Sequence, residues 1–219
     1  AAPNCAVVFP DGKRVLGRRT GIYFPRDLAL IQLPEGDYPA VDPAPMGALK
    51  KGDWVVAFGH PGGLKPDVQP AFSAGRVTGA VEGGVAVMGI LDYQGGIETD
   101  LAIYSGNSGG PLFDLEGRLV GINGAVNQLT GASFSLGLDI ISATLPKLTD
   151  GRVWLSDEMV LDPSQQQWRA IFEMFEPMSR QAAQNWLDNG WPGEKMPGAA
   201  GPLPKRAPSG LEGIAQRLL

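Results

Sequence analysis

The chain has 219 residues with a formal net charge of −5, and 43% of its residues are hydrophobic. This length suits one large or two small globular domains, and the acidic balance argues against nucleic acid or an anionic membrane surface as the partner. Cys5 and His60 are the only cysteine and the only histidine, so we expect no internal disulfide and no zinc site.

The first 140 residues predict short β-strands separated by turns. The chain contains 31 glycines and 19 prolines, a content typical of all-β domains with many turns. The sequence PDGK at 10–13 predicts a turn, EGR at 116–118 predicts a tight hairpin, and the four prolines within 34–50 predict a linker. The expected strands are residues 6–9, 27–33, 53–59, 72–81, 85–91, 95–99, 112–115, 119–126 and 133–140. Their regular spacing predicts a sandwich or a barrel.

The character of the sequence changes near residue 141. A short helix is expected at 141–148, and two further helices are expected at 164–175 and 179–189. The first of these two carries Trp168, Ile171, Phe172 and Phe175 at helical spacing. We interpret this aromatic stripe as packing against the β domain rather than as a partner-binding groove. Residues 191–210 are rich in proline and glycine, which predicts a flexible tail.

The segment TDLAIYSGNSGGPL at 99–112 carries the chemistry. Glycines on both sides of Ser108 let the backbone turn sharply and leave room for a substrate. They also allow successive N–H groups to point into one spot and stabilise an oxyanion. Ser108 is therefore the candidate nucleophile, and the N–H groups of Gly106 and Ser108 are the candidate oxyanion donors. For a bare G-x-S-x-G match a serine that merely caps a turn is the commoner case, but GNSGGPL followed by a strand–turn–strand pattern is more specific.

This segment resembles that of the trypsin-like serine peptidases, and among them the HtrA (Deg) family. The resemblance covers residues 6–146 and includes DLALIQL at 27–33, DWVVAFGHPGGL at 53–64 and GRLVGIN at 117–123. It implies an all-β fold of two antiparallel six-stranded barrels, the first incomplete here, and it implies no metal and no cofactor. The implied barrels are the remainder of the N-terminal barrel at 1–40 and the C-terminal barrel with the nucleophile at 41–146. Beyond the resemblance, the helical and Pro/Gly-rich patterns predict a helical C-terminal extension at 147–190 and a Pro/Gly-rich tail at 191–219.

The resemblance also assigns residues of a catalytic site. Asp27 takes the place of the triad aspartate, which orients a histidine and stabilises its imidazolium form. Ala102 stands where tryptic enzymes carry the aspartate that binds Lys or Arg. We therefore expect a small apolar primary pocket, walled partly by the segment Ile122-Asn123-Gly124. Asn107 replaces the aspartate that pairs with a newly cut N-terminus in trypsin-like zymogens, so activation by that route is not expected.

The general base of the triad is not found in this sequence. The family order is His, Asp, Ser, and residues 1–26 contain no histidine. We therefore expect the chain to be the C-terminal part of a longer protease, with the histidine upstream of Ala1, rather than a complete chain. Asp27, His60 and Ser108 follow the subtilisin order, but His60 lies between Gly59 and Pro61 in a loop, and we interpret it as a surface loop residue. An α/β-hydrolase would need a histidine after the serine, and none follows residue 60.

The sequence thus predicts a serine endopeptidase that acts on polypeptide substrates, with little activity in the chain alone. A pseudoprotease that binds peptides or serves as a scaffold is the alternative, because the histidine is missing. The family commonly continues into a PDZ domain, which residues 147–219 do not resemble. Localisation outside the cytoplasm, in the periplasm or as a secreted protein, is expected by analogy with the family. The sequence does not indicate an oligomeric state.

Overall fold

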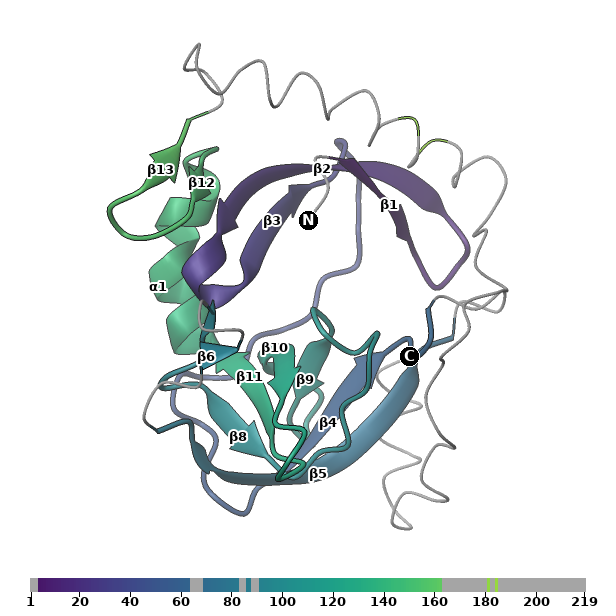
Figure 1. Ribbon diagram of the computed structural model, residues 1–219. Coiled ribbons are helices and arrows are strands. Elements are labelled where there is room, and N and C mark those ends of the chain that lie inside the picture. The colour runs from purple at the N-terminus through teal and green to yellow at the C-terminus, as the bar shows by residue number, and fades with distance from the viewer. Residues whose placement is uncertain are drawn as a thin grey trace. The chain divides into compact units, whose positions relative to one another are not determined.

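A computed structural model of the protein describes residues 4–63, 69–82, 86–87 and 91–162, together with positions 181 and 184 (Figure 1). The described residues divide into two compact units. The first takes residues 4–38 together with 142–162, and the second takes residues 39–141. No helix within the described residues is long and apolar enough to cross a membrane.

The first unit is an open, mostly antiparallel sheet built on one long strand. β1 (Asn4–Val8) and β2 (Arg14–Tyr23) pair antiparallel, and the expected turn joins them. In that turn the Lys13 N–H donates to the Asp11 carboxylate over 2.8 Å, and Gly12 takes a φ of +82°. After the 3-10 turn η1 (Phe24–Arg26), β3 (Leu28–Gln32) returns antiparallel to β2.

A second segment completes this sheet from far along the chain. Helix α1 (Leu138–Thr149) ends before Gly151, whose φ is +79°, as is common just beyond a helix C-terminus. β12 (Val153–Trp154) then pairs in parallel with the end of β2, and β13 (Val160–Leu161) pairs antiparallel with β12. The expectation of a helical extension from residue 147 therefore does not hold for 153–161, because these β-branched and aromatic residues extend the sheet instead. The helix expected at 164–175 and the tail lie outside the described residues, and of the helix expected at 179–189 only Gln181 and Gln184 are described.

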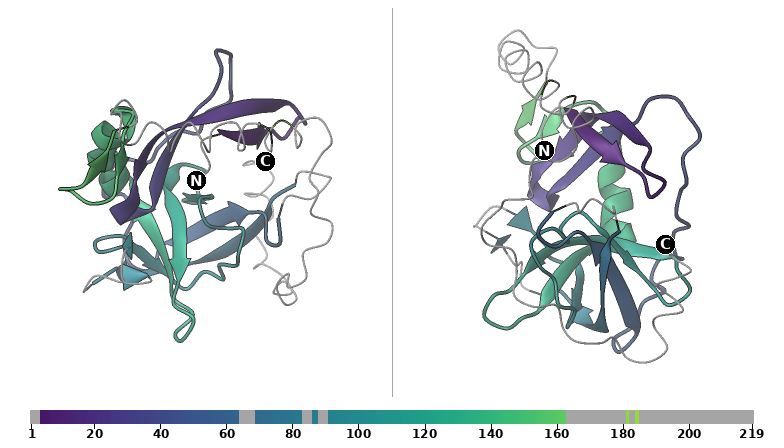
Figure 2. Two further views of the ribbon diagram at one scale, coloured as in Figure 1. Left: turned by 45° about the horizontal axis from the view of Figure 1, so that its top comes forward. Right: turned by 90° about the vertical axis from the view of Figure 1, so that its right-hand side faces the viewer.

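The second unit is the closed six-stranded barrel that the sequence predicts. Its strands follow one another around the barrel in the order β10-β11-β8-β5-β4-β9, drawn from blue to green in Figures 1 and 2. They are β4 (Trp54–Gly59), β5 (Ala71–Ala80), β8 (Ile97–Thr99), β9 (Pro111–Phe113), β10 (Leu119–Val126) and β11 (Ser133–Gly137). The all-β class is confirmed. The strand expected at 85–91 divides into β6 (Ala86–Val87) and β7 (Leu91–Asp92), and β11 ends early because α1 begins at Leu138.

The barrel core explains why β4 is apolar at nearly every position. Val55 and Ala57 belong to one buried cluster, and Val56 and Phe58 belong to another. Successive side chains of a strand point to opposite faces, so β4 is buried on both. The first cluster also holds Leu101 and Ile103, which lead into the segment around Ser108.

The hairpin between β9 and β10 places the nucleophile segment against β10, and Asp114 stabilises its turn. The Asp114 carboxylate accepts the backbone N–H groups of Glu116 (3.0 Å) and Arg118 (2.8 Å). Its other oxygen pairs with the Arg118 guanidinium at 2.7 Å. Gly117 occupies the position with a φ of +80°, a conformation that glycine adopts without a Cβ penalty. The tight hairpin expected at 116–118 is therefore confirmed.

Candidate active site

The candidate nucleophile lies on the loop of residues 100–110, between β8 and β9. The side chain of Ser108 is exposed, and its hydroxyl donates a hydrogen bond to the Gly124 carbonyl on β10 over 2.8 Å. The hydroxyl is thus reachable from solvent and held against the barrel wall.

Two glycines give the loop its shape. Gly106 has a φ of +103° and Gly109 a φ of +81°, values that L side chains rarely adopt. A Cβ at Gly106 would also overlap the carbonyl oxygen of His60. The Asn107 N–H donates to the Tyr104 carbonyl, and the Gly110 N–H donates to the Asn107 carbonyl, each over 2.9 Å. The SGNSGG sequence therefore folds into consecutive tight turns around Ser108.

A neighbouring loop, residues 59–63, holds the carbonyl groups of this turn. The His60 N–H donates to the Gly106 carbonyl over 3.0 Å, and the Gly62 N–H donates to the Ser105 carbonyl over 3.2 Å. Gly59 leaves the space for this approach, because a Cβ there would lie 2.6 Å from the Asn107 Cα. We name residues 59–63 the support loop. Sequence reasoning missed it, although the run GHPGG beside a strand end is a signal for close backbone approach.

The two candidate oxyanion donors are not used elsewhere in the part of the chain that the structure describes. Neither the Gly106 N–H nor the Ser108 N–H donates to any described atom. Backbone N–H groups that have no acceptor within the protein bond to solvent or to a ligand. These two lie on an exposed turn beside a serine hydroxyl, so an acceptor from solvent or substrate can reach them.

On the other side, the nucleophile loop pairs with β10. The Gly109 N–H donates to the Asn123 carbonyl over 2.7 Å, and the Asn123 N–H donates to the Gly110 carbonyl over 2.9 Å. The Asn123 side chain is 1% exposed. Its amide nitrogen donates to the Pro111 carbonyl (3.0 Å), and its oxygen accepts the Ser135 hydroxyl (3.1 Å). Both ends of this side chain are therefore engaged in the barrel, while Ile122 and Gly124 on either side are half-buried.

Two further expected site residues lie in distinct environments. Ala102 is half-buried between the buried Leu101 and Ile103, in the same unit as Ser108. Asp27 lies in the first unit, directly before β3, and its side chain is exposed. It adopts a φ of 52° and a ψ of 35°, and its N–H donates to the Phe24 carbonyl over 3.0 Å. Aspartate tolerates this left-handed conformation better than most residues, and the sequence did not predict it.

His60 and Asn107 lie next to Ser108 or its loop, and both are more buried than exposed loop residues. His60 lies in a loop between β4 and β5, as expected, but it is half-buried and its backbone holds the nucleophile loop, so it is more than a surface residue. The Asn107 side chain is 1% exposed, and its Oδ1 accepts no hydrogen bond within the described residues. A carboxylate at this position would be buried without a partner, consistent with the asparagine found there.

Comparisons with known proteins identify the family of this chain. Residues 2–122 match the family described as the trypsin-like peptidase domain. A "Probable periplasmic serine endoprotease DegP-like" of Chlamydia pneumoniae is 31% identical over 144 residues, which are 66% of this chain and 28% of the relative. A protein of the same description from Bartonella henselae is 36% identical over 141 residues, which are 64% of this chain and 26% of the relative.

A solved structure described as "HtrA-type protease AlgW with tripeptide" has a TM-score of 0.56 and 26% identity, and the match covers 66% of this chain and 47% of that one. The chain thus spans 28% of the length of the Chlamydia pneumoniae relative and about half of this solved chain. The match over residues 2–122 covers more than half of the chain and includes Ser108 and Asp27. The chain therefore belongs to the trypsin-like peptidase domain family.

Proposed function

We propose that this chain supplies the nucleophile and the oxyanion donors of a serine endopeptidase that hydrolyses peptide bonds in polypeptide substrates. The observation that carries the proposal is the exposed Ser108 hydroxyl on a turn whose Gly106 and Ser108 N–H groups have no acceptor among the described residues. Preorganised donors of this kind stabilise the charge that develops on a carbonyl oxygen during acyl transfer.

In the proposed reaction the Ser108 hydroxyl leaves the Gly124 carbonyl and attacks the carbonyl carbon of the scissile bond. The hydroxyl proton passes to a histidine imidazole, which a preceding segment of a longer protein supplies, and Asp27 accepts the other ring N–H. The oxyanion accepts hydrogen bonds from Gly106 and Ser108. When the C–N bond breaks, the imidazolium returns the proton to the leaving amine, and water then hydrolyses the acyl-serine ester by the same steps.

The proposed substrate site follows the β10 side of the nucleophile. The primary pocket is small and apolar, with Ala102, Ile122, Asn123 and Gly124 contributing to it. Because the Asn123 side chain is buried and hydrogen-bonded at both ends, Asn123 contributes through its backbone. A polypeptide substrate is supported by the relatives of known structure, whose descriptions include a bound tripeptide and a bound decapeptide.

Relatives described as periplasmic support a location outside the cytoplasm. We propose an extracytoplasmic protease, and the expected cleavage is after small apolar residues rather than after lysine or arginine.

The test uses the longest natural polypeptide that contains this chain. A fluorophosphonate probe should label it at Ser108, and a peptide library should be cleaved after small apolar residues. Both signals should vanish in Ser108→Ala while the melting temperature stays unchanged. A natural polypeptide that is folded, binds peptides and is not labelled would overturn the proposal and would favour a peptide-binding pseudoprotease.

A further inference from the structure

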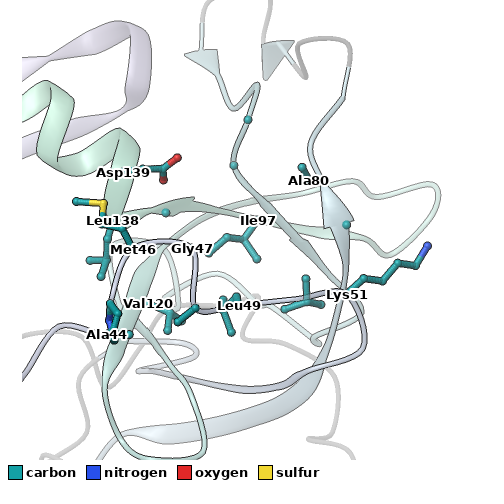
Figure 3. Close-up of a pocket in the computed structure, with 17 residues that line it drawn as sticks. Ala44, Met46, Gly47, Leu49, Lys51, Ala80, Ile97, Val120, Leu138 and Asp139 are labelled. Atoms are coloured by element: carbon teal, nitrogen blue, oxygen red, sulfur yellow. The ribbon is translucent and has the colours of Figure 1, made fainter.

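The second unit contains a cavity of about 340 Å³ that the proposed reaction does not use (Figure 3). Its wall is formed by the segment 44–51, the end of β5, residues 95–97 before β8, and residues 137–139, where β11 passes into α1. No residue of the nucleophile loop or the support loop lines it. The volume falls at the lower end of the range for ligand pockets, about 300–1,000 Å³.

The floor of the cavity is the barrel's own hydrophobic core. Val77 and Val120 are 6% and 5% exposed and belong to the buried cluster that also contains Leu101. The partly buried side chains of Ile97 and Leu138 pack against the same cluster and line the cavity. An apolar side chain inserted here would extend the core rather than rest on a surface.

The charged groups at the rim differ in their orientation. Figure 3 shows the Asp139 carboxylate at one side of the cavity and Lys51 at the opposite side, with the ammonium end of Lys51 directed away from the apolar residues. Both residues are exposed, and neither forms an ion pair or a side-chain hydrogen bond with any described residue. Asp139 follows Leu138 directly, so one unpaired negative charge adjoins the apolar lining.

The segment 44–51 offers backbone donors to a ligand. The N–H groups of Gly47 and Leu49, two residues apart, donate to no atom of the described chain. Backbone N–H groups that are unpaired and have this spacing are what an extended peptide uses when it binds alongside a strand or a loop.

From these three features we propose that the cavity is a second polypeptide-binding site, distinct from the Ser108 site, for an extended segment in which an apolar residue and a lysine or arginine stand two positions apart, so that both side chains face the protein. The apolar side chain fills the space above Val77 and Val120. The basic group pairs with Asp139, and the ligand backbone bonds to Gly47 and Leu49. An acidic residue in the same place would face the carboxylate and be repelled. The proposal does not depend on the proposed catalysis.

The test measures peptide binding to this chain carrying Ser108→Ala, so that no cleavage interferes. Fluorescent octapeptides of glycine and serine with a central Leu-Ser-Lys sequence (the Leu-Lys peptide) are compared by anisotropy with versions in which serine replaces the leucine (Ser-Lys) or glutamate replaces the lysine (Leu-Glu). We expect the Leu-Lys peptide to bind about tenfold or more tightly than Ser-Lys, since burying one leucine side chain alone supports that ratio. It should also bind more tightly than Leu-Glu, whose carboxylate is repelled by Asp139. Equal binding of the three peptides, or no binding at millimolar concentration, would overturn the proposal.

Variants of the protein then locate the site. Asp139→Lys should weaken Leu-Lys binding at least fivefold and restore binding of the Leu-Glu peptide. Glu158→Lys, which makes the same charge change at an exposed carboxylate in the other unit, should leave both unchanged. Gly79→Leu should abolish binding, because Gly79 lines the cavity and a Cβ there meets open space.

Three outcomes of these variants refute the assignment. Binding that survives Gly79→Leu would place the peptide elsewhere. Equal effects of Asp139→Lys and Glu158→Lys would mean that the peptide responds to the overall charge of the protein and not to the Asp139 carboxylate. If the protein binds no peptide but forms a dimer, and Gly79→Leu makes it monomeric, the cavity would instead bind a second copy of the chain. Fluorophosphonate labelling of natural protein with Gly79→Leu should match the unsubstituted protein, which separates this proposal from the catalytic one.

Discussion

The contact between the support loop and the nucleophile loop predicts a large effect from one methyl group. In Gly59→Ala the new Cβ would lie 2.6 Å from the Asn107 Cα and 2.9 Å from the Gly106 carbonyl oxygen. Both are backbone atoms, so no side-chain rotation relieves the overlap. Reaching an ordinary contact of 3.4 Å requires the nucleophile loop to retreat by up to about 0.8 Å.

That retreat would break the hydrogen bonds that hold the peptide groups around the candidate oxyanion donors. The Gly62 N–H to Ser105 carbonyl distance of 3.2 Å, which fixes the peptide group carrying the Gly106 N–H, and the His60 N–H to Gly106 carbonyl distance of 3.0 Å would each grow by up to about 0.8 Å, beyond hydrogen-bonding range. Overpacking of this kind costs about 1–3 kcal/mol of stability. Displacing one oxyanion donor costs about 10²–10³ in kcat, so the catalytic loss should exceed what the lost stability explains.

The assay is the second-order rate of fluorophosphonate labelling of the natural polypeptide, measured beside its free energy of unfolding in urea. Gly79→Ala is the matched control, because its Cβ meets nothing within 4 Å, and it should label at the unsubstituted rate. Gly59→Ala labelled within twofold of the unsubstituted rate would refute the reasoning that the support loop positions the oxyanion donors.

Three further predictions concern stability and are measured by urea unfolding. Asn107→Asp buries a carboxylate without a partner and should lower the free energy of unfolding at pH 7 by about 3 kcal/mol or more, with partial recovery toward pH 4 as the group protonates; a loss below about 1 kcal/mol would contradict this account of the site. Asp114→Ala removes the acceptor of two backbone N–H groups in the β9–β10 turn and should cost about 1–3 kcal/mol, whereas Glu116→Ala, which removes an exposed carboxylate, should cost much less. Burial, followed by its hydrogen bond to Asp157, raises the pKa of the Tyr23 phenol. Its stabilising contribution is therefore present below the unfolded-state pKa of about 10 and is lost as the pH rises through the higher folded-state value, so unfolding free energy should fall more steeply above pH 10 in the unsubstituted protein than in Tyr23→Phe.

The sequence predicted those parts of the fold that local patterns determine. The strand at 53–59 was predictable because β4 is buried on both faces and therefore reads as a continuous apolar run. The hairpin at 116–118 was predictable because Asp114 and Gly117 supply the acceptor and the backbone conformation that the turn needs. The nucleophile segment was predictable because glycine is required by conformation at Gly106 and Gly109.

The support loop was not predictable in the same way. Its contacts with the nucleophile segment are made by backbone N–H groups of His60 and Gly62, which every residue except proline carries. Side-chain types therefore do not reveal them. Only the absence of a side chain at Gly59 is visible in the sequence, and a glycine at a strand end has several ordinary explanations.

The pairing of β12 with β2 was unpredictable for a further reason, since it joins residues that are more than a hundred positions apart. The Tyr23 hydroxyl donates to the Asp157 carboxylate over 2.6 Å, across 134 residues of sequence. Lys147 of α1 forms an ion pair with Asp157, and its ammonium lies 4.5 Å from the centre of the Tyr23 ring. Nothing in the sequence around these three residues marks them as partners. Together they hold the end of β2, four positions before Asp27. The segment that follows the closed barrel thus stabilises the strand that leads to the candidate triad aspartate, through contacts that no local pattern predicts.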